Sequence, residues 1–385
     1  MIAPLPQALP ALRARVAVDS SLSYKSLETA MDVVSRARPG AESPALRRSG
    51  ADPAGKAVAM TEVATPALVR AAAVQAESAV LDVDGGAEKA CRLIAEAAGM
   101  GARLIVFPES FIPVYPNGSL WGRGLSRFGA PEAKRAFARM HRNSVEVPGP
   151  VTERLARAAG EAKALVVIGV SEREARRDTL FNTLVFLGPD GAYLGKHRKL
   201  VPTNHERLLW GMGDGSTLGV FDTPVGRVGG LICWENWMPL ARYALYAQGE
   251  QIHLAPNADD REIFLVNARN TAAEGRVFVV CAGTYLRKSR YPADFELKED
   301  LAPLAEELGT GGSAIIGPDG EFLAGPLWNQ EGILIADLDL DRIPQERQLL
   351  DVTGHFARPD VLSLRFNRSP QRSLEGDSGD STPES

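Results

Sequence analysis

The sequence predicts an α/β fold in which a mixed sheet is covered by helices, formed as one continuous domain over residues 63–340. Short apolar runs alternate along this region with longer segments whose apolar residues recur at helical spacing. Three pairs of apolar runs are joined by turns that contain glycine and proline, a pattern typical of antiparallel hairpins. Alternating strands and helices favour a sheet with helices packed against its faces, and the hairpins add antiparallel neighbours to that sheet.

In the first half of the domain, strand and helix signals alternate. The second expected strand stops at Pro108. The first expected helix ends at a glycine, as helices commonly do. A second helix follows the break at Pro148-Gly149-Pro150. The expected strands are 67–76, 103–110 and 165–172, and the expected helices are 85–102 and 151–164.

The second half contains the three hairpins as well as further alternation. Two of the hairpins turn at the same Gly-Pro-Asp-Gly string, which favours a tight turn. Pro239 lies in the first turn of a helical segment, where proline is tolerated. The expected hairpins are 181–200, 217–236 and 312–324, the helices are 238–249 and 261–276, and the strands are 250–258, 277–283 and 332–340.

Composition sets both ends of the chain apart from the domain. Residues 1–62 are rich in Ala, Pro, Ser and Arg, so we expect a flexible N-terminal extension. Residues 369–385 are almost wholly polar and are expected to be a disordered tail. The C-terminal segment 341–368 carries apolar side chains that need a partner surface, so we expect an oligomer contact there. These side chains are Ile343, Leu349, Leu350, Val352 and Leu362.

The overall composition argues against several classes of protein. The net charge is −5, so the chain lacks the basic surface that nucleic-acid binding requires. No stretch approaches the roughly 20 apolar residues of a membrane span, so no membrane partner is expected. Three widely spaced cysteines do not form a disulfide framework and indicate a reducing compartment, which we take to be the cytoplasm. Histidines and cysteines lack metal-ligand spacing, so neither a metal nor another cofactor is expected.

Three expected strands deliver chemically useful side chains at or near their ends: Glu109, Lys199 and Cys233. A cysteine can attack an electrophilic carbon, a carboxylate can move protons, and an ammonium can stabilise developing negative charge. Cys233 also precedes a helical segment, and a helix N-terminus lowers the pKa of a thiol. The apolar surroundings expected for Cys91 and Cys281 instead predict raised pKa values and inert thiols.

Each of these residues alone has an ordinary structural explanation. A glutamate after a strand is usually solvated, a lysine among basic neighbours usually lies on the surface, and a lone cysteine is usually packed. His197 and His205 raise a further alternative, a Cys–His protease pair, but no orienting Asn or Asp is evident.

The segments that carry these residues resemble the signatures of a known family. "FPES" at 107–110, "GKHRKLVPT" at 195–203 and "LICWENWMPL" at 231–240 are similar to the three signature segments of the nitrilase branch of the carbon–nitrogen hydrolase superfamily. Their order and spacing agree with that branch, and the resemblance covers roughly residues 65–366. The Cys-Trp-Glu-Asn and Gly-His-Phe-Ala-Arg-Pro-Asp strings resemble nitrilases more than the amidase branches.

The resemblance implies a four-layer αββα sandwich and a cofactor-free hydrolase that turns a nitrile into a carboxylic acid and ammonia. It implies Cys233 as the nucleophile of a thioimidate and a thioester, Glu109 as general base and acid, and Lys199 as electrostatic stabiliser. A second glutamate, Glu206, would orient the lysine and the substrate. Trp210 and Trp234 lie in or beside the signature segments and are expected to line the substrate pocket.

The resemblance also implies a homo-oligomer, either a dimer or a spiral assembly built from dimers. Two alternatives remain open on the sequence. An aliphatic amidase would use the same Glu-Lys-Cys set on a carbonyl carbon. A non-catalytic, filament-forming assembly protein is conceivable, although a scaffold has no reason to keep Glu109, Lys199 and Cys233 together.

Overall fold

The computed structural model describes residues 68–175 and 177–371 of the 385-residue chain. All of them belong to one compact unit, Glu62–Ser385. The extension predicted for residues 1–62 lies outside the described residues, as does all but the first three residues of the tail predicted for 369–385.

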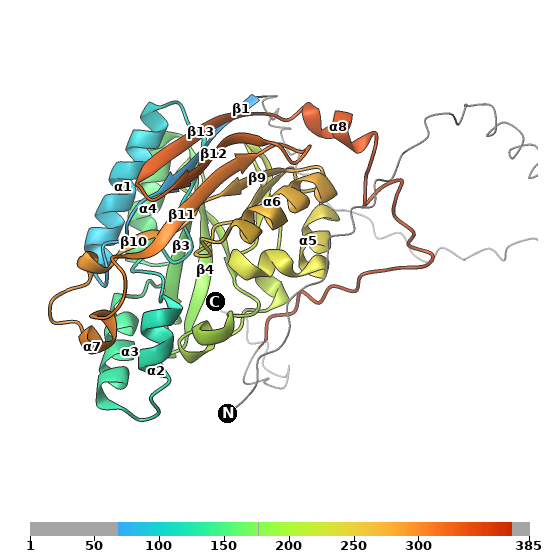
Figure 1. The fold of residues 1–385 in the computed structure, drawn as a ribbon. Helices are drawn as coiled ribbons and strands as arrows, with labels where there is room; N and C mark the ends of the chain where they lie inside the picture. The colour runs from blue at the N-terminus through green and yellow to red at the C-terminus, as the bar shows by residue number, and fades with distance from the viewer. Residues whose placement is uncertain (1–67, 176, 372–385) are drawn as a thin grey trace, which may run out of the picture. The chain divides into compact units, whose positions relative to one another are not determined.

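Two mixed sheets form the centre of the fold (Figure 1). The first sheet has the order β13-β1-β2-β3-β4-β5, and the second has the order β10-β11-β9-β8-β7-β6, with β12 paired to β11. The strands of the first sheet are β1 (Leu68–Gln75), β2 (Leu104–Val106), β3 (Leu165–Arg173), β4 (Leu180–Leu187), β5 (Tyr193–Arg198) and β13 (Gly332–Asp339). Those of the second are β6 (Phe221–Thr223), β7 (Gly226–Gly230), β8 (Ile252–Leu254), β9 (Phe278–Cys281), β10 (Tyr285–Arg287), β11 (Glu307–Ile316) and β12 (Phe322–Trp328).

Both sheets combine parallel and antiparallel pairs, as the hairpins predict. In the first sheet β1, β2 and β3 are parallel, whereas β4 and β5 follow β3 as antiparallel neighbours. In the second sheet β7, β8 and β9 are parallel, and β6–β7 and β11–β12 are the two remaining predicted hairpins. All three predicted hairpins are therefore present.

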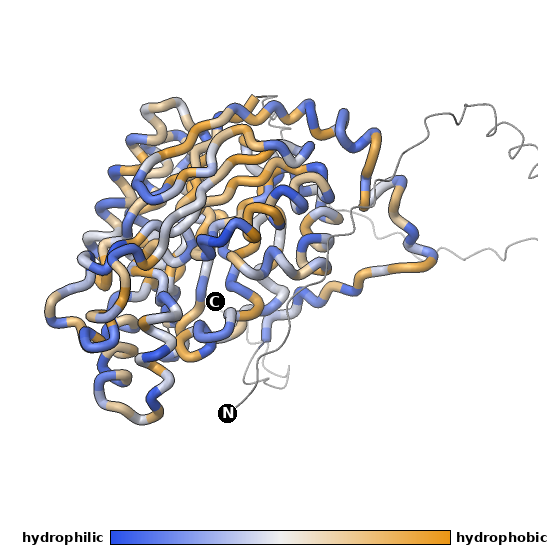
Figure 2. Tube along the Cα trace, viewed as in Figure 1, coloured by the Kyte–Doolittle hydropathy of each residue, from blue (hydrophilic) through white to orange (hydrophobic). Residues whose placement is uncertain are grey.

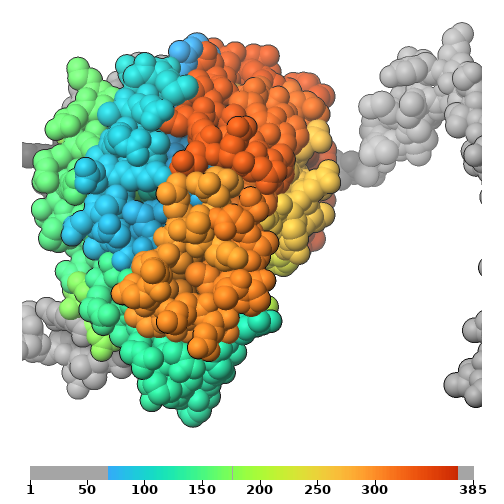
Figure 3. Space-filling model, turned by 60° about the vertical axis from the view of Figure 1, so that its left-hand side comes forward, coloured from blue at the N-terminus to red at the C-terminus, as the bar shows by residue number. Residues whose placement is uncertain are grey.

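Helices cover the outer face of each sheet. On the first sheet, α1 (Val83–Gly99) and α4 (Pro150–Ala162) pack through residues such as Ile94 and Leu155. On the second sheet, α6 (Glu262–Gly275) packs on β9 and β11, and α5 (Pro239–Tyr246) lies beside α6. Figure 2 shows apolar residues running along the strands, and Figure 3 shows α1 exposed on one face beside the C-terminal strands.

The facing surfaces of the two sheets form a shared apolar core. Val106 and Phe186 from the first sheet pack in the same cluster as Val228 and Phe278 from the second, and all four are inaccessible to solvent. Burying both faces of the strands explains why their sequences are continuous apolar runs rather than alternating ones. The arrangement is helix, sheet, sheet, helix, so the expected αββα sandwich is confirmed.

Several short elements have no counterpart among the predicted ones. They are η3 (Gly118–Gly122), α2 (Arg123–Leu125), α3 (Pro131–Asn143), η4 (Asn204–Leu208), η5 (Gly215–Thr217), β10, η7 (Lys288–Arg290), α7 (Lys298–Leu301) and α8 (Arg342–Arg347). The longest, α3, buries only Ala133, Ala136 and Met140, so its apolar stripe is too narrow to stand out.

The C-terminal segment leaves the sandwich after α8 and loops away from it (Figure 1). The side chains of Leu349 and Leu362 are 67% and 77% exposed, which leaves apolar surface available for a partner. Ile343 is buried in the chain's own core and Val352 packs against another of its core clusters, so the expectation that these two need a partner is wrong. The end of the segment returns to the body, where the backbone N–H of Gln371 donates to Asp214 at 2.7 Å.

Candidate active site

The two sheets bring the three predicted chemical groups into one buried site. Glu109 follows β2 and Lys199 follows β5 in the first sheet, while Cys233 follows β7 in the second. Lys199 Nζ donates to Glu109 Oε1 at 2.8 Å, and both side chains are inaccessible to solvent. Cys233 is 2% exposed, and the charges of Glu109 and Lys199 both act on its thiol. Residues that lie far apart in the sequence thus meet where strands end.

Glu206 joins this cluster from η4 (Asn204–Leu208), a short 3₁₀ turn just after Lys199. Its carboxylate accepts from Lys199 Nζ at 2.8 and 3.0 Å, and from the backbone N–H of Thr203 at 2.8 Å. The hydroxyl of Tyr115 donates to the same carboxylate at 2.8 Å. Glu206 and Glu109 therefore both hold Lys199 Nζ in place.

The two oxygens of the Glu109 carboxylate have different surroundings. Oε1 accepts from Lys199 and from Asn182 Nδ2, at 2.8 and 2.7 Å. Oε2 is buried and has no hydrogen-bond partner among the described residues. Burial, opposed by Lys199 and reinforced by Glu206, raises the pKa of Glu109 to about 7. A carboxylate with one free oxygen and a pKa near neutrality suits reversible proton transfer.

Lys199 keeps its positive charge in this site. Burial opposes ionisation, but Glu109 and Glu206 outweigh it and raise the pKa of Lys199 above its ordinary value. A permanent ammonium between two carboxylates neutralises part of their charge and leaves a fixed positive group beside the thiol.

The predicted lowering of the Cys233 pKa is wrong. Burial, followed by the negative charge of Glu109, raises the pKa of the Cys233 thiol well above its ordinary value, and Lys199 only partly opposes this. Cys233 begins η6 (Cys233–Trp237), a five-residue 3₁₀ turn, whereas the α-helix α5 starts only at Pro239. One ammonium already faces two carboxylates, so a thiolate would be a further buried anion. The raised pKa favours the neutral thiol over the thiolate.

The backbone at Cys233 adopts a left-handed conformation with φ of 53°. Non-glycine residues rarely adopt such angles, and the surrounding structure must hold them there. The Cys233 N–H donates to the carbonyl of Pro256 at 2.9 Å, and Ala258 N–H hydrogen bonds to the sulfur. The thiol is thus presented on a sharp turn between β7 and α5.

The two predicted pocket tryptophans lie in different places. Trp210 is buried and packs against Tyr115, with ring centroids 6.2 Å apart, so it supports the residue that contacts Glu206. Trp234 is 40% exposed, and its Nε1 donates to Asp259 at 2.9 Å under the guanidinium of Arg261. The described contacts of Trp234 are therefore outside the Glu109–Lys199 cluster.

Tyr115 and Asn182 are site residues that the sequence prediction missed. Asn182 had a usable signal, because it interrupts the apolar run of β4 and is only 1% exposed. A polar side chain in a strand that is buried on both faces needs a partner. Tyr115 lies in a loop without periodicity, and no local pattern marks it.

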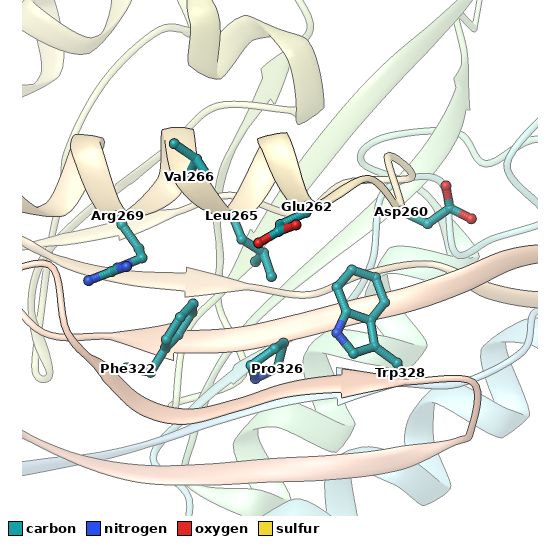
Figure 4. Close-up of a pocket in the computed structure, with 8 residues that line it drawn as sticks. All are labelled: Asp260, Glu262, Leu265, Val266, Arg269, Phe322, Pro326 and Trp328. Carbon is teal, nitrogen blue, oxygen red and sulfur yellow. The ribbon is translucent and has the colours of Figure 1, made fainter. Parts of the chain in front are cut away.

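A separate surface pocket lies between α6 and β12 (Figure 4). It is lined by Asp260, Glu262, Leu265, Val266, Arg269, Phe322, Pro326 and Trp328. None of Glu109, Lys199, Glu206 or Cys233 lines it, so it is not part of the cluster described above.

The carboxylates of the site form hydrogen bonds with Lys199 and do not surround a metal ion. In residues 68–175 and 177–371, no group of three His, Cys, Asp or Glu side chains is placed to hold a metal ion. We expect activity to survive prolonged dialysis against EDTA. Turnover that disappears on chelation and returns with a divalent ion would contradict this expectation.

Comparisons with known proteins agree with the geometry. Residues 70–348 match the family model described as carbon-nitrogen hydrolase. A bifunctional nitrilase/nitrile hydratase of Nicotiana tabacum is 46% identical over 300 residues, which cover 77% of this chain and 85% of that protein. An aliphatic nitrilase of Sinorhizobium fredii is 45% identical over 79% of this chain and 97% of its own length.

Solved structures show the same fold at lower identity. Nit3 of Saccharomyces cerevisiae, a member of the nitrilase superfamily, superposes with a TM-score of 0.58 at 21% identity and covers 75% of this chain and 96% of its own. An amidase from Nesterenkonia sp. gives a TM-score of 0.53 at 20% identity and covers 73% and 94%. At this identity the likeness concerns the fold alone.

Proposed function

The chain belongs to the carbon–nitrogen hydrolase family, and we propose that it is a nitrilase that converts an organic nitrile and two waters into a carboxylic acid and ammonia. The names of its relatives support nitriles as the substrate class. The observation that carries the mechanism is the free Oε2 of Glu109 in the buried site of Cys233.

In the first step, the thiol adds to the nitrile carbon. Glu109 Oε2 accepts the S–H proton as the C–S bond forms, and then delivers that proton to the nitrile nitrogen. One π bond of the nitrile breaks, and the product is a neutral thioimidate on Cys233. Because the pKa of Glu109 is about 7, it can accept and return a proton at neutral pH.

Lys199 stabilises the negative charge that develops during the reaction. Its ammonium is held by Glu109 and Glu206, so it needs little reorganisation when negative charge develops on the reacting atoms. Tyr115 is a phenol whose pKa is raised by burial and by Glu206, so it remains a donor that keeps the Glu206 carboxylate oriented.

In the second step, Glu109 removes a proton from water, which adds to the thioimidate carbon. The tetrahedral intermediate carries a hydroxyl, an amino group and the sulfur. Glu109 supplies the proton taken from water to the nitrogen to form this amino group. When the C–N bond breaks, Glu109 moves the hydroxyl proton to the leaving nitrogen, so ammonia departs and the C=O bond of a thioester forms. A second water releases the carboxylic acid and restores the thiol.

The same intermediate offers a second outcome. If its C–S bond breaks instead, the products are an amide and the free thiol. Relatives named bifunctional nitrilase/nitrile hydratases support this branch as a minor route in the present chain.

Matched nitrile and amide substrates test the proposed reaction. With aliphatic, aromatic and arylacetonitrile members, we expect ammonia and acid to appear in equal amounts from the nitriles, with a smaller amount of amide. An enzyme that hydrolyses the amides but leaves every matched nitrile intact would support the amidase alternative instead.

We further propose a cytoplasmic homo-oligomer. The three free thiols support a reducing compartment, and none of the helices in the described ranges is long and apolar enough to cross a bilayer. The C-terminal segment supports self-association, because Leu349, Phe356 and Leu362 are each more than 60% exposed on a loop that leaves the sandwich.

Light scattering should therefore give a mass of at least twice the chain's 41.3 kDa at micromolar concentration. The double variant Leu349→Ser/Leu362→Ser should shift the protein toward monomers, because it removes apolar area from the proposed contact. Phe128→Ser is a matched control, since Phe128 is fully exposed but lies outside the segment. A fully active wild-type monomer would refute the proposal.

A further inference from the structure

We propose that a buried chain of side chains, Glu250–His253–Asn236, positions the turn that presents Cys233. None of the three touches the reacting atoms, so they are positioning residues. The proposal rests on the role of Cys233 proposed above. Glu250 and His253 are inaccessible to solvent, and Asn236 is 1% exposed.

The side-chain amide of Asn236 stabilises the Cys233 turn by hydrogen bonds within the turn. Its Nδ2 donates to the carbonyls of Leu231 and Cys233, at 3.0 and 2.8 Å. Its own backbone carbonyl accepts from Arg242 Nη1 and from Asn267 Nδ2. The side-chain amide therefore bridges the residues on either side of Ile232, and its backbone is tied to α5 and α6.

These contacts fix the direction of the Asn236 amide. The nitrogen must face the two carbonyl oxygens, so Oδ1 faces the other way, toward His253 Nε2 at 2.8 Å. An amide oxygen can only accept. His253 therefore donates from Nε2.

The other ring nitrogen of His253 also faces an acceptor. Nδ1 lies 3.0 and 3.1 Å from the two oxygens of Glu250. Glu250 at Nδ1 and Asn236 at Nε2 together fix the orientation of the imidazole ring.

The strand beside the pair makes room for it. A Cβ at Gly229, in β7, would lie 2.3 Å from Glu250 Oε1. The absence of a side chain there lets the carboxylate approach the strand that leads into the Cys233 turn. Glu250 and His253 are themselves joined to β8, the neighbour of β7.

The Cys233 turn needs such support because its backbone is strained. A left-handed cysteine persists only where surrounding contacts hold it, and the Asn236 amide bonds to the Cys233 carbonyl itself. If His253 no longer fixes the Asn236 amide, the turn can relax and move the sulfur away from Glu109. Small displacements of reacting groups reduce rates strongly.

Kinetics of three variants test the positioning role. For His253→Leu we expect kcat to fall by about tenfold to a hundredfold, with KM changed by less than about threefold. His253→Gln should retain more activity, because an amide N–H can still donate toward Asn236. Glu250→Gln should fall between them. Alkylation of Cys233 by iodoacetamide should slow in the same order.

Tyr291→Phe is the matched control. It removes a buried hydrogen bond, from Trp121 Nε1 at 2.9 Å, in a cluster that does not include the Cys233 turn. Its melting temperature should fall, while kcat should stay at the wild-type value. If a His253 variant does not fold, Glu250→Gln, which keeps the side-chain shape, decides the kinetic test.

The hydrogen bond from His253 Nε2 to Asn236 is tested on the wild-type protein by ¹H–¹⁵N NMR of its five histidines, with His253→Gln used for assignment. We expect an Nε2–H signal of His253 at pH 7 that exchanges slowly with solvent, because both partners are buried. A His253 Nε2 that carries no hydrogen at pH 7, or folded His253→Leu and Glu250→Gln proteins with wild-type kcat, would overturn the proposal. Turnover retained by Cys233→Ala would instead overturn the proposed function.

Discussion

Cys233→Ala is expected to lose nitrile turnover by about 10⁴-fold or more while the protein remains folded. The thiol forms the covalent bond of both intermediates, and alanine offers no replacement. The change removes one sulfur from a buried position, so the sandwich should persist with a modest loss of stability. Ammonia release measures turnover, and the melting temperature reports the fold.

The other two cysteines are matched controls. Cys91 lies on α1 and Cys281 ends β9, and burial raises the pKa of both thiols, to about 12 for Cys281. Neither lies in the Glu109–Lys199 cluster, so Cys91→Ala and Cys281→Ala should keep nearly all activity. Loss of turnover in either control, or its retention in Cys233→Ala, would place the nucleophile elsewhere.

Glu109→Gln is expected to lower turnover by about 10²- to 10⁴-fold, the range typical for a group that transfers protons. Glutamine has nearly the same shape and can still accept from Lys199 and Asn182, but it cannot take the thiol proton. Because burial raises the Cys233 pKa, the thiol depends on this base. Initial rates of nitrile loss in the two proteins measure the effect.

The pH profile separates proton transfer from a structural effect. Protonated Glu109 cannot act as a base, so the wild-type rate should fall as pH falls through about 7, the pKa of Glu109. Glu109→Gln should lack this limb. Glu77→Gln is a suitable control, because Glu77 is also a buried carboxylate, paired with Arg287 and Arg290. A Glu77→Gln protein that lost the same limb would count against Glu109.

The sequence predicted the regular part of the fold because its signals are local. Strands buried on both faces appear as apolar runs, and the three hairpins have strong turn residues. The order of the strands within each sheet depends on contacts between distant segments, and only the family resemblance implied the two packed sheets. Helix α3 was missed because small alanines make up most of its buried face.

The sequence predicted those residues of the candidate site that lie at the ends of strands. Glu109, Lys199 and Cys233 each follow a strand, but nothing local shows that Asn182 bonds to Glu109 or that Tyr115 bonds to Glu206. The direction of the Cys233 pKa shift was predicted wrongly for the same reason. The expected helix N-terminus is a local feature. The burial of the thiol and the nearby carboxylates dominate its pKa, and both result from the packing of the two sheets.

The central claim is that a nitrile becomes covalently attached to Cys233. Acid quenching of wild-type protein during turnover, followed by peptide mass spectrometry, tests it most directly, because acid preserves a thioester. We expect the peptide that contains Cys233 to gain the mass of the substrate's acyl group, and Glu109→Gln to show little of this species. A nitrile that is consumed while Cys233 stays unmodified at every quench time, with the acyl group found on another residue, would contradict the account.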